Sequence, residues 1–174
     1  MPSDGDTVTV LQNQTQYKIR LYGIDTPEKG QDFGNRAKQF TSNLVFEKQV
    51  RVVSRDMISY DRMVGMIYID NICVNEAIIR AGFAWIDHRY CKDSICREWV
   101  SIAATAKKDK TSLWAHPDPI PPWDYRGIRS TTSTKDESSG AYHGNTRSMV
   151  FTSHHANTST VKTARPFLKA GRRQ

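Results

Sequence analysis

Residues 4–28 read Asp-Gly-Asp-Thr-Val-Thr-Val-Leu-Gln-Asn-Gln-Thr-Gln-Tyr-Lys-Ile-Arg-Leu-Tyr-Gly-Ile-Asp-Thr-Pro-Glu. Within residues 7–11 and 17–24 apolar or β-branched side chains alternate with polar ones, which is typical of strands with one buried face. The polar residues 12–14 between them indicate a turn. This stretch therefore predicts a β-hairpin.

Hydrophobic spacing predicts the remaining elements. Helices are expected over residues 34–46, 74–81 and 94–110, and strands over residues 49–54, 64–69 and 83–86. Residues 117–123 contain four prolines and are expected to close the domain as an extended strap. Short strands with interspersed helices, in a chain long enough for one domain, predict a small α+β domain or a capped barrel.

The positive charge is concentrated towards the C-terminus. The net charge is +7, yet residues 1–126 hold 17 Lys and Arg against 16 Asp and Glu, whereas residues 127–174 hold eight against two. Residues 1–126 therefore carry little of the excess positive charge that is typical of nucleic-acid-binding domains. A nucleic-acid function must be argued from particular residues. Serine and threonine dominate after Arg126, which predicts a disordered basic tail over residues 127–174.

Targeting and cysteine signals narrow the class of protein. No run of 18 apolar residues is present, which argues against a membrane-spanning helix, and residues 1–5 have no signal-peptide pattern.

Cys91 and Cys96 are either two free thiols or a short disulfide that clamps a loop, and the disulfide would imply an oxidising compartment. Zinc is disfavoured because two further ligands at finger spacing are missing.

Three carboxylates are associated with the hairpin. Asp6 and Asp25 flank its two strands, so the fold could bring them together. Two adjacent carboxylates repel each other unless one is protonated or a cation lies between them. A hard divalent ion held by a few protein oxygens and water satisfies such a pair. Glu28, three residues after Asp25, could reach a water molecule beside that ion.

Two arginines complete the candidate site. Arg20 lies five residues before Asp25, and Arg62 lies in a separate motif, Tyr60-Asp61-Arg62-Met63-Val64-Gly65. Two guanidiniums and a cation suit a phosphodiester, because hydrolysis adds negative charge to its oxygens. Each motif alone has an ordinary explanation as a turn or a solvated face, and the spacing of an EF-hand is absent. Their joint occurrence is much more specific.

Taken together, the motifs resemble the staphylococcal nuclease (thermonuclease-like) family over about residues 4–126. The resemblance is carried by residues 4–7, 20–28, 31–34, 37–38, 60–65, 74–77, 82–85 and 113–114. Pro121-Pro122-Trp123 and Arg126 look like its bacterial, often plasmid-borne, branch. The resemblance implies a mainly β OB-fold, a five-stranded Greek-key barrel with three helices, over residues 1–126.

The resemblance also implies roles for individual residues. It implies calcium ligands at Asp6, Asp25 and the backbone carbonyl of Thr26, a general base at Glu28, phosphate-binding arginines at Arg20 and Arg62, and substrate-binding tyrosines at Tyr60 and Tyr90. His88 stands where the family has a second pocket tyrosine. The implied activity is a calcium-dependent endonuclease that hydrolyses DNA and RNA, single strands preferred, and leaves 3′-phosphates. The protein would act as a monomer and would not associate with a membrane.

Both ends of the chain depart from the family pattern. Only three residues precede Asp4, where the family has most of a first strand, so we expect a truncated reading of a longer gene whose intact product is secreted or periplasmic. Residues 142–151 resemble the start of a cysteine-rich extension found in the bacterial branch. A one-base shift of a back-translated message can restore cysteines after Phe151, so we hypothesise that residues after that point are a frameshift product.

Two alternatives to a nuclease remain open. One is an OB-fold nucleic-acid-binding module that has lost catalysis, which the complete set of catalytic residues argues against. The other is a truncated, non-functional fragment, which the short N-terminus favours.

Overall fold

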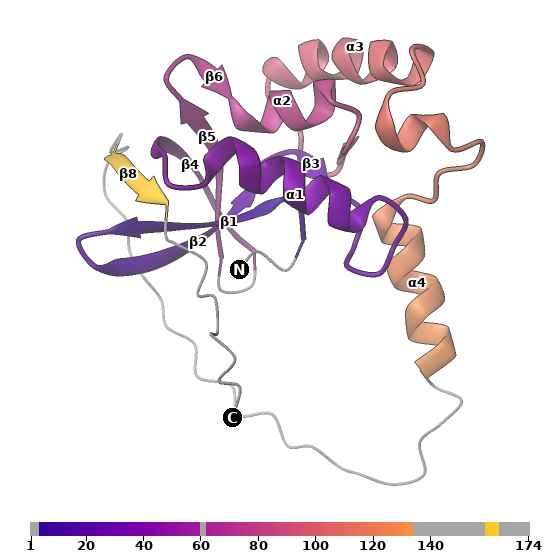
Figure 1. Cartoon of the computed structure of the whole chain (residues 1–174), viewed down its shortest axis with the longest axis horizontal. Helices are drawn as coiled ribbons and strands as arrows, with labels where there is room; N and C mark the ends of the chain where they lie inside the picture. The colour runs from indigo at the N-terminus through magenta and orange to yellow at the C-terminus, as the bar shows by residue number, and fades with distance from the viewer. Residues whose placement is uncertain (1–3, 60–61, 134–158, 164–174) are drawn as a thin grey trace, which may run out of the picture.

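The computed structural model describes residues 4–59, 62–133 and 159–163 (Figure 1). The elements in chain order are β1 (Thr7–Gln12), β2 (Thr15–Leu21), β3 (Ile24–Asp25), α1 (Gly34–Val45), β4 (Gln49–Ser59), β5 (Arg62–Ile69), β6 (Ile72–Cys73), α2 (Val74–Arg80), β7 (Trp85–Ile86), α3 (Ile95–Lys108), the 3-10 helix η1 (Ser112–Ala115), α4 (Pro122–Ser133) and β8 (Ser159–Thr163). Within these ranges no helix has the length and apolar character needed to cross a bilayer.

The predicted hairpin is confirmed. Strands β1 and β2 pair antiparallel, with Thr7 opposite Arg20 and Gln12 opposite Thr15, so two residues form the turn. These two, Asn13 and Gln14, have φ values of 48° and 66°. A two-residue hairpin turn of type I′ requires positive φ at both positions, because its twist then matches that of the strands. The apolar side chains Val8, Val10, Ile19 and Leu21 are buried, as the alternation predicted.

The strands form a mixed sheet. Strand β2 also pairs in parallel with β5, which pairs antiparallel with β4. Strand β8 lies between β1 and β4 and pairs antiparallel with both. Helix α2 packs against α1, α3 and β5. This combination of mixed sheet and helices fits an OB-fold, while the five-stranded Greek-key barrel stays a prediction.

The three predicted helices are confirmed to within one or two residues at each end, as α1, α2 and α3. Helix α3 turns Trp99 into the core, where its side chain is fully buried beside Tyr22 at a ring-centroid distance of 6.5 Å. Most of the largest fully buried side chains come from the hairpin, β5, α2 and α3 together. Burial of this shared apolar surface holds the helices against the sheet.

The number of helices was predicted incorrectly, and the strap predicted over residues 117–123 is helical in its last two residues. A fourth helix, α4, begins at Pro122 and continues past Arg126 to Ser133. Proline is well suited to the first helical position, where its missing N–H is not needed. The negative charge of Asp124 in the first turn also stabilises the helix, because it interacts favourably with the helix dipole. Trp123 also packs edge-on against Trp85, at 6.5 Å between ring centroids. These tertiary and capping effects outweigh the proline-rich composition.

The tail predicted to be disordered over residues 127–174 differs from the structure in two places. Residues 127–133 belong to α4, and residues 159–163 form β8. Strand β8 gains backbone hydrogen-bonding partners on both sides, which local composition does not reveal. Residues 134–158 and 164–174 lie outside the described part, so the disorder and the frameshift stay hypotheses there.

The two clustered cysteines lie beside the loop that leads to Asp25. Cys91 and Cys96 are joined in the structure, with their Cα atoms 5.7 Å apart. Gly23 has a φ of 72°, and a Cβ atom there would lie 2.7 Å from the sulfur of Cys91. Only glycine can therefore adopt this backbone conformation at position 23 and leave room for the sulfur of Cys91. The Cys91–Cys96 loop thus packs directly on the turn between β2 and β3.

Protein made in an oxidising compartment is expected to carry the Cys91–Cys96 disulfide. Alkylation under denaturing conditions without reductant, followed by mass spectrometry, should label one thiol, that of the free Cys73. Labelling of all three thiols would contradict the pairing. Because the loop is short, Cys96→Ser is expected to lower the free energy of unfolding by only about 2 kcal/mol.

Candidate active site

The hairpin and the short strand β3 bring two buried carboxylates together. Asp6 directly precedes β1 and Asp25 ends β3, and each side chain is only 1% exposed. The register that sets Thr7 opposite Arg20 also puts Arg20 beside Asp6. The turn at Gly23 then returns the chain, so that Asp25 reaches the same place. Buried carboxylates are stable only when paired or bound to a cation.

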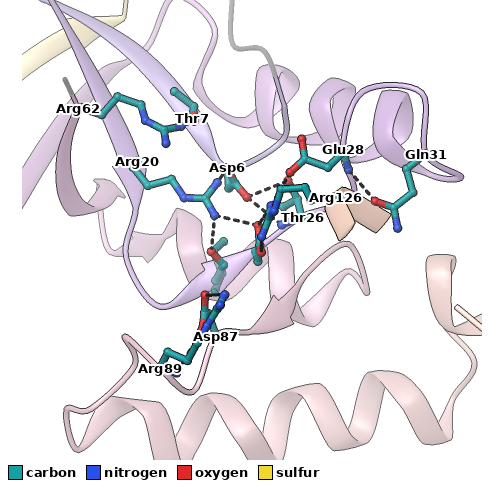
Figure 2. A network of polar contacts seen from close by, with 12 residues as sticks. Asp6, Thr7, Arg20, Thr26, Glu28, Gln31, Arg62, Asp87, Arg89 and Arg126 are labelled. Carbon is teal, nitrogen blue, oxygen red and sulfur yellow. Dashed lines mark hydrogen bonds and ion pairs between the residues drawn. The ribbon is translucent and has the colours of Figure 1, made fainter. Parts of the chain in front are cut away.

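A single guanidinium bridges the two carboxylates. Arg20 Nη2 donates to Asp25 Oδ1 at 2.8 Å and to the carbonyl of Ile24 at 3.3 Å. Its other terminal nitrogen forms an ion pair with Asp6 (Figure 2). The convergence of Asp6, Asp25 and Arg20 that the sequence suggested is therefore present in the structure.

Thr26 ties the loop after β3 to Asp6. Its backbone N–H donates to Asp6 Oδ2 at 2.8 Å, and its hydroxyl donates to the same oxygen at 3.1 Å. Both residues are 1% exposed. Because Asp25 and Thr26 are consecutive, these bonds hold both of them against Asp6.

Glu28 lies in the same loop, between β3 and α1. Its backbone N–H donates to Gln31 Oε1 at 2.9 Å, and its carbonyl accepts from the Gln31 N–H at 3.0 Å. Helix α1 begins at Gly34, where a Cβ atom would collide with the Glu28 carbonyl. Glycine at this position allows the helix to approach the loop closely. Both the N–H and the carbonyl of Glu28 are thus hydrogen-bonded, whereas its side chain is 24% exposed.

Arg62, the second predicted phosphate-binding arginine, is the first residue of β5. Its Nη1 donates to the hydroxyl of Thr7 at 3.1 Å, so its guanidinium lies near the start of β1 (Figure 2). Of the two predicted substrate-binding tyrosines, Tyr60 lies outside the described residues. Tyr90 is 56% exposed, and the guanidinium of Arg89 stands 5.6 Å from its ring centroid.

Arg126 was not predicted as a site residue. Its Nη2 donates to Asp25 Oδ2 at 2.7 Å, and its Nη1 donates to Glu28 Oε1 at 2.5 Å (Figure 2). Hydrogen bonds from the guanidinium to Asp25, and then to Glu28, hold the pKa of Arg126 above its usual value despite partial burial. The sequence marked Arg126 only as a feature of the bacterial branch. Pro122, as a helix start, was the one signal that could have placed it.

A second ion pair, also not predicted, lies beside the site. Asp87 accepts two hydrogen bonds from the Arg89 guanidinium, at 2.9 and 2.8 Å, and its backbone N–H donates to the carbonyl of Gly23. Burial by itself raises the pKa of Asp87, but the bonds from Arg89 outweigh it and leave that pKa below its usual value. The Asp87 carboxylate therefore stays ionised beside Arg89, while the Asp87 backbone N–H secures the Gly23 turn.

The three carboxylates of the site outnumber the guanidiniums that contact them directly, with Arg62 nearby at Thr7. Asp6, Asp25 and Glu28 contribute three carboxylates, and Arg20 and Arg126 are the guanidiniums that contact them. Such a cluster can attract a hard cation through its oxygens, while arginines at its edge can contact a phosphate.

Comparisons with known proteins point to one family. The family model described as "Staphylococcal nuclease homologue" matches residues 18–116. The chain is 37% identical over 124 residues to an uncharacterised endonuclease of Escherichia coli O157:H7, covering 71% of this chain and 79% of the relative. It is 32% identical over 134 residues to a micrococcal nuclease of Shigella flexneri, covering 71% and 75%. It is also 34% identical over 125 residues to an uncharacterised endonuclease of Haemophilus influenzae, covering 71% and 68%.

Proposed function

The chain belongs to the staphylococcal nuclease family, and from this premise we propose that it is a calcium-dependent endonuclease that hydrolyses DNA and RNA and leaves 3′-phosphates. The relatives named as nucleases support a hydrolase acting on nucleic acids. The observation that carries the proposal is the convergence of the buried Asp6 and Asp25 on one guanidinium, with Glu28 in the adjoining loop.

The donor set fits calcium by its chemistry. Asp6 and Asp25 offer carboxylate oxygens and Thr26 offers a backbone carbonyl, and oxygen ligands are those that hard divalent cations prefer. Hard divalent cations of this kind keep water molecules as further ligands. When bound, calcium would polarise the phosphate and offset its charge.

The side chains then divide the reaction between them. Glu28 takes a proton from a water molecule, whose oxygen forms a bond to phosphorus. The bond from phosphorus to the 5′-oxygen breaks, and this oxygen leaves as a 5′-hydroxyl with a proton from solvent, so that the phosphate stays on the 3′ side. Arg20 and Arg62 donate hydrogen bonds to the phosphate oxygens as negative charge grows on them.

The preference for single strands, the monomeric state and the secreted or periplasmic location are part of the same proposal. Tyr90 is exposed beside Arg89, and an exposed aromatic ring with a neighbouring cation can stack on an unpaired base. The Cys91–Cys96 pairing supports an oxidising compartment.

The full chain is expected to digest heat-denatured DNA with calcium and to stop when a chelator is added. The products should accept label from polynucleotide kinase without prior phosphatase treatment, because their 5′ ends are free hydroxyls. DNA binding in a mobility-shift assay without cleavage would instead favour the binding module, and neither binding nor cleavage would favour the inactive fragment. Digestion that persists after chelation would contradict the proposed calcium dependence.

A further inference from the structure

Arg126 has no role in the reaction proposed above, although it contacts two of the carboxylates. We propose that Arg126 is a positioning residue that fixes the Glu28 carboxylate beside Asp25. This inference rests on the proposed function, because it deepens the role of the general base.

The two arms of the guanidinium divide between the two carboxylates. Nη2 donates to Asp25 Oδ2 at 2.7 Å, Nη1 donates to Glu28 Oε1 at 2.5 Å, and Nη1 also reaches Asp25 Oδ1 at 3.4 Å. The planar fork of arginine holds such a pair in a fixed relation. Because the bond to Glu28 uses Oε1, the second carboxylate oxygen, Oε2, can receive a proton from water.

Without Arg126, the Glu28 side chain would have few constraints. The bonds to Gln31 hold the backbone of Glu28 and leave its carboxylate, which is partly exposed, able to rotate. A glutamate has three side-chain torsions, and ordering them costs conformational entropy. A contact that orders this carboxylate in advance therefore lowers the cost of reaching the reactive geometry.

Helix α4 is placed to deliver Arg126. Trp123 packs edge-on against Trp85, and Trp85 is the residue of β7 that pairs with Asp25 of β3. Trp123 and Arg126 are three residues apart and so share one face of the helix. The tryptophan contact therefore turns the Arg126 side chain towards Asp25.

A second link joins the segment before α4 to the loop that carries Glu28. Gln31 Nε2 donates to the carbonyl of Ile120 at 2.6 Å, while its Oε1 accepts from the Glu28 backbone. The loop and the start of α4 are thus connected through one side chain, independently of Arg126. This link should keep α4 in place when Arg126 is substituted, which makes the substitution informative.

Removal of Arg126 is expected to change calcium affinity and kcat in opposite directions. Arg126→Ala removes a positive charge from a cluster of three carboxylates, so calcium should bind more tightly, by about two- to fivefold for a partly exposed charge. The same change frees Glu28, so kcat should fall by about 10- to 100-fold, the range seen when partners that orient site residues are removed. KM for a short single-stranded DNA should change little.

Two further variants separate the causes. Arg126→Lys keeps the charge but has no fork, so its calcium affinity should be near that of the unsubstituted protein while kcat stays low. Arg129→Ala is the matched control, because it removes an equal charge from an exposed position on the same helix. It should leave both kcat and calcium affinity unchanged.

The measurements are steady-state digestion for kcat and KM, and isothermal titration with calcium alone for affinity, with circular dichroism as a check of folding. Lower kcat together with tighter calcium binding in Arg126→Ala supports the inference. An unchanged kcat would overturn it, and so would weaker calcium binding or full recovery of kcat in Arg126→Lys. If the unsubstituted chain does not digest DNA, the proposed function fails instead, so the two failures are distinguishable.

Discussion

Glu28→Gln is expected to lower the rate of DNA hydrolysis by about 10²- to 10⁴-fold, the usual contribution of a positioned general base. Glutamine has nearly the same shape and can still accept a hydrogen bond from Arg126, but it cannot take a proton from water. The carboxylate is partly exposed and its loop is held through the backbone. The fold should therefore survive the substitution, and the loss should appear in kcat.

The rate is best measured on heat-denatured DNA at saturating calcium, with thermal unfolding as a check of stability. Glu98→Gln is a suitable control, because Glu98 is an exposed residue of α3 and the substitution changes the net charge equally. Digestion by Glu28→Gln at the unsubstituted rate would show that the base is another group.

Arg20→Lys is expected to lower the rate by about 10²-fold, comparable to the loss of one donor that stabilises charge in a transition state. Lysine keeps the positive charge but loses the fork that matches a phosphate. In the structure the same fork also spans Asp6 and Asp25. A single ammonium group cannot make both contacts in this geometry, so the two buried carboxylates should also be held less firmly.

Arg51→Lys offers a matched control for Arg20→Lys. Arg51 lies in β4, where its guanidinium packs over the ring of Tyr68 at 4.2 Å, and it has no part in the proposed reaction. Comparison of kcat for the two variants on one DNA substrate isolates the effect of the site. Equal rates for Arg20→Lys and the unsubstituted protein would show that Arg20 is only structural.

Local patterns were sufficient to predict most elements and part of the site. Alternation over residues 7–24 predicted the hairpin, and helical spacing predicted α1, α2 and α3. Because Asp6 and Asp25 flank one hairpin, their proximity was also predictable from the sequence. The roles assigned to Asp6, Asp25, Thr26, Glu28, Arg20 and Arg62 came from family resemblance and stay proposals that the variants above would test.

The sequence by itself determined the features that depend on near neighbours, namely the hairpin, three helices and the proximity of Asp6 and Asp25 around Arg20. Only the tertiary structure decided where distant segments meet. Arg126 reaches Glu28 across 98 positions of sequence, and β8 finds its place between β1 and β4 through backbone pairing. Hydrophobic periodicity describes which face of an element is buried, but it does not specify the partner. The contact between Trp123 and Trp85 supplies that information for α4, because burial of two large rings selects one orientation of the helix.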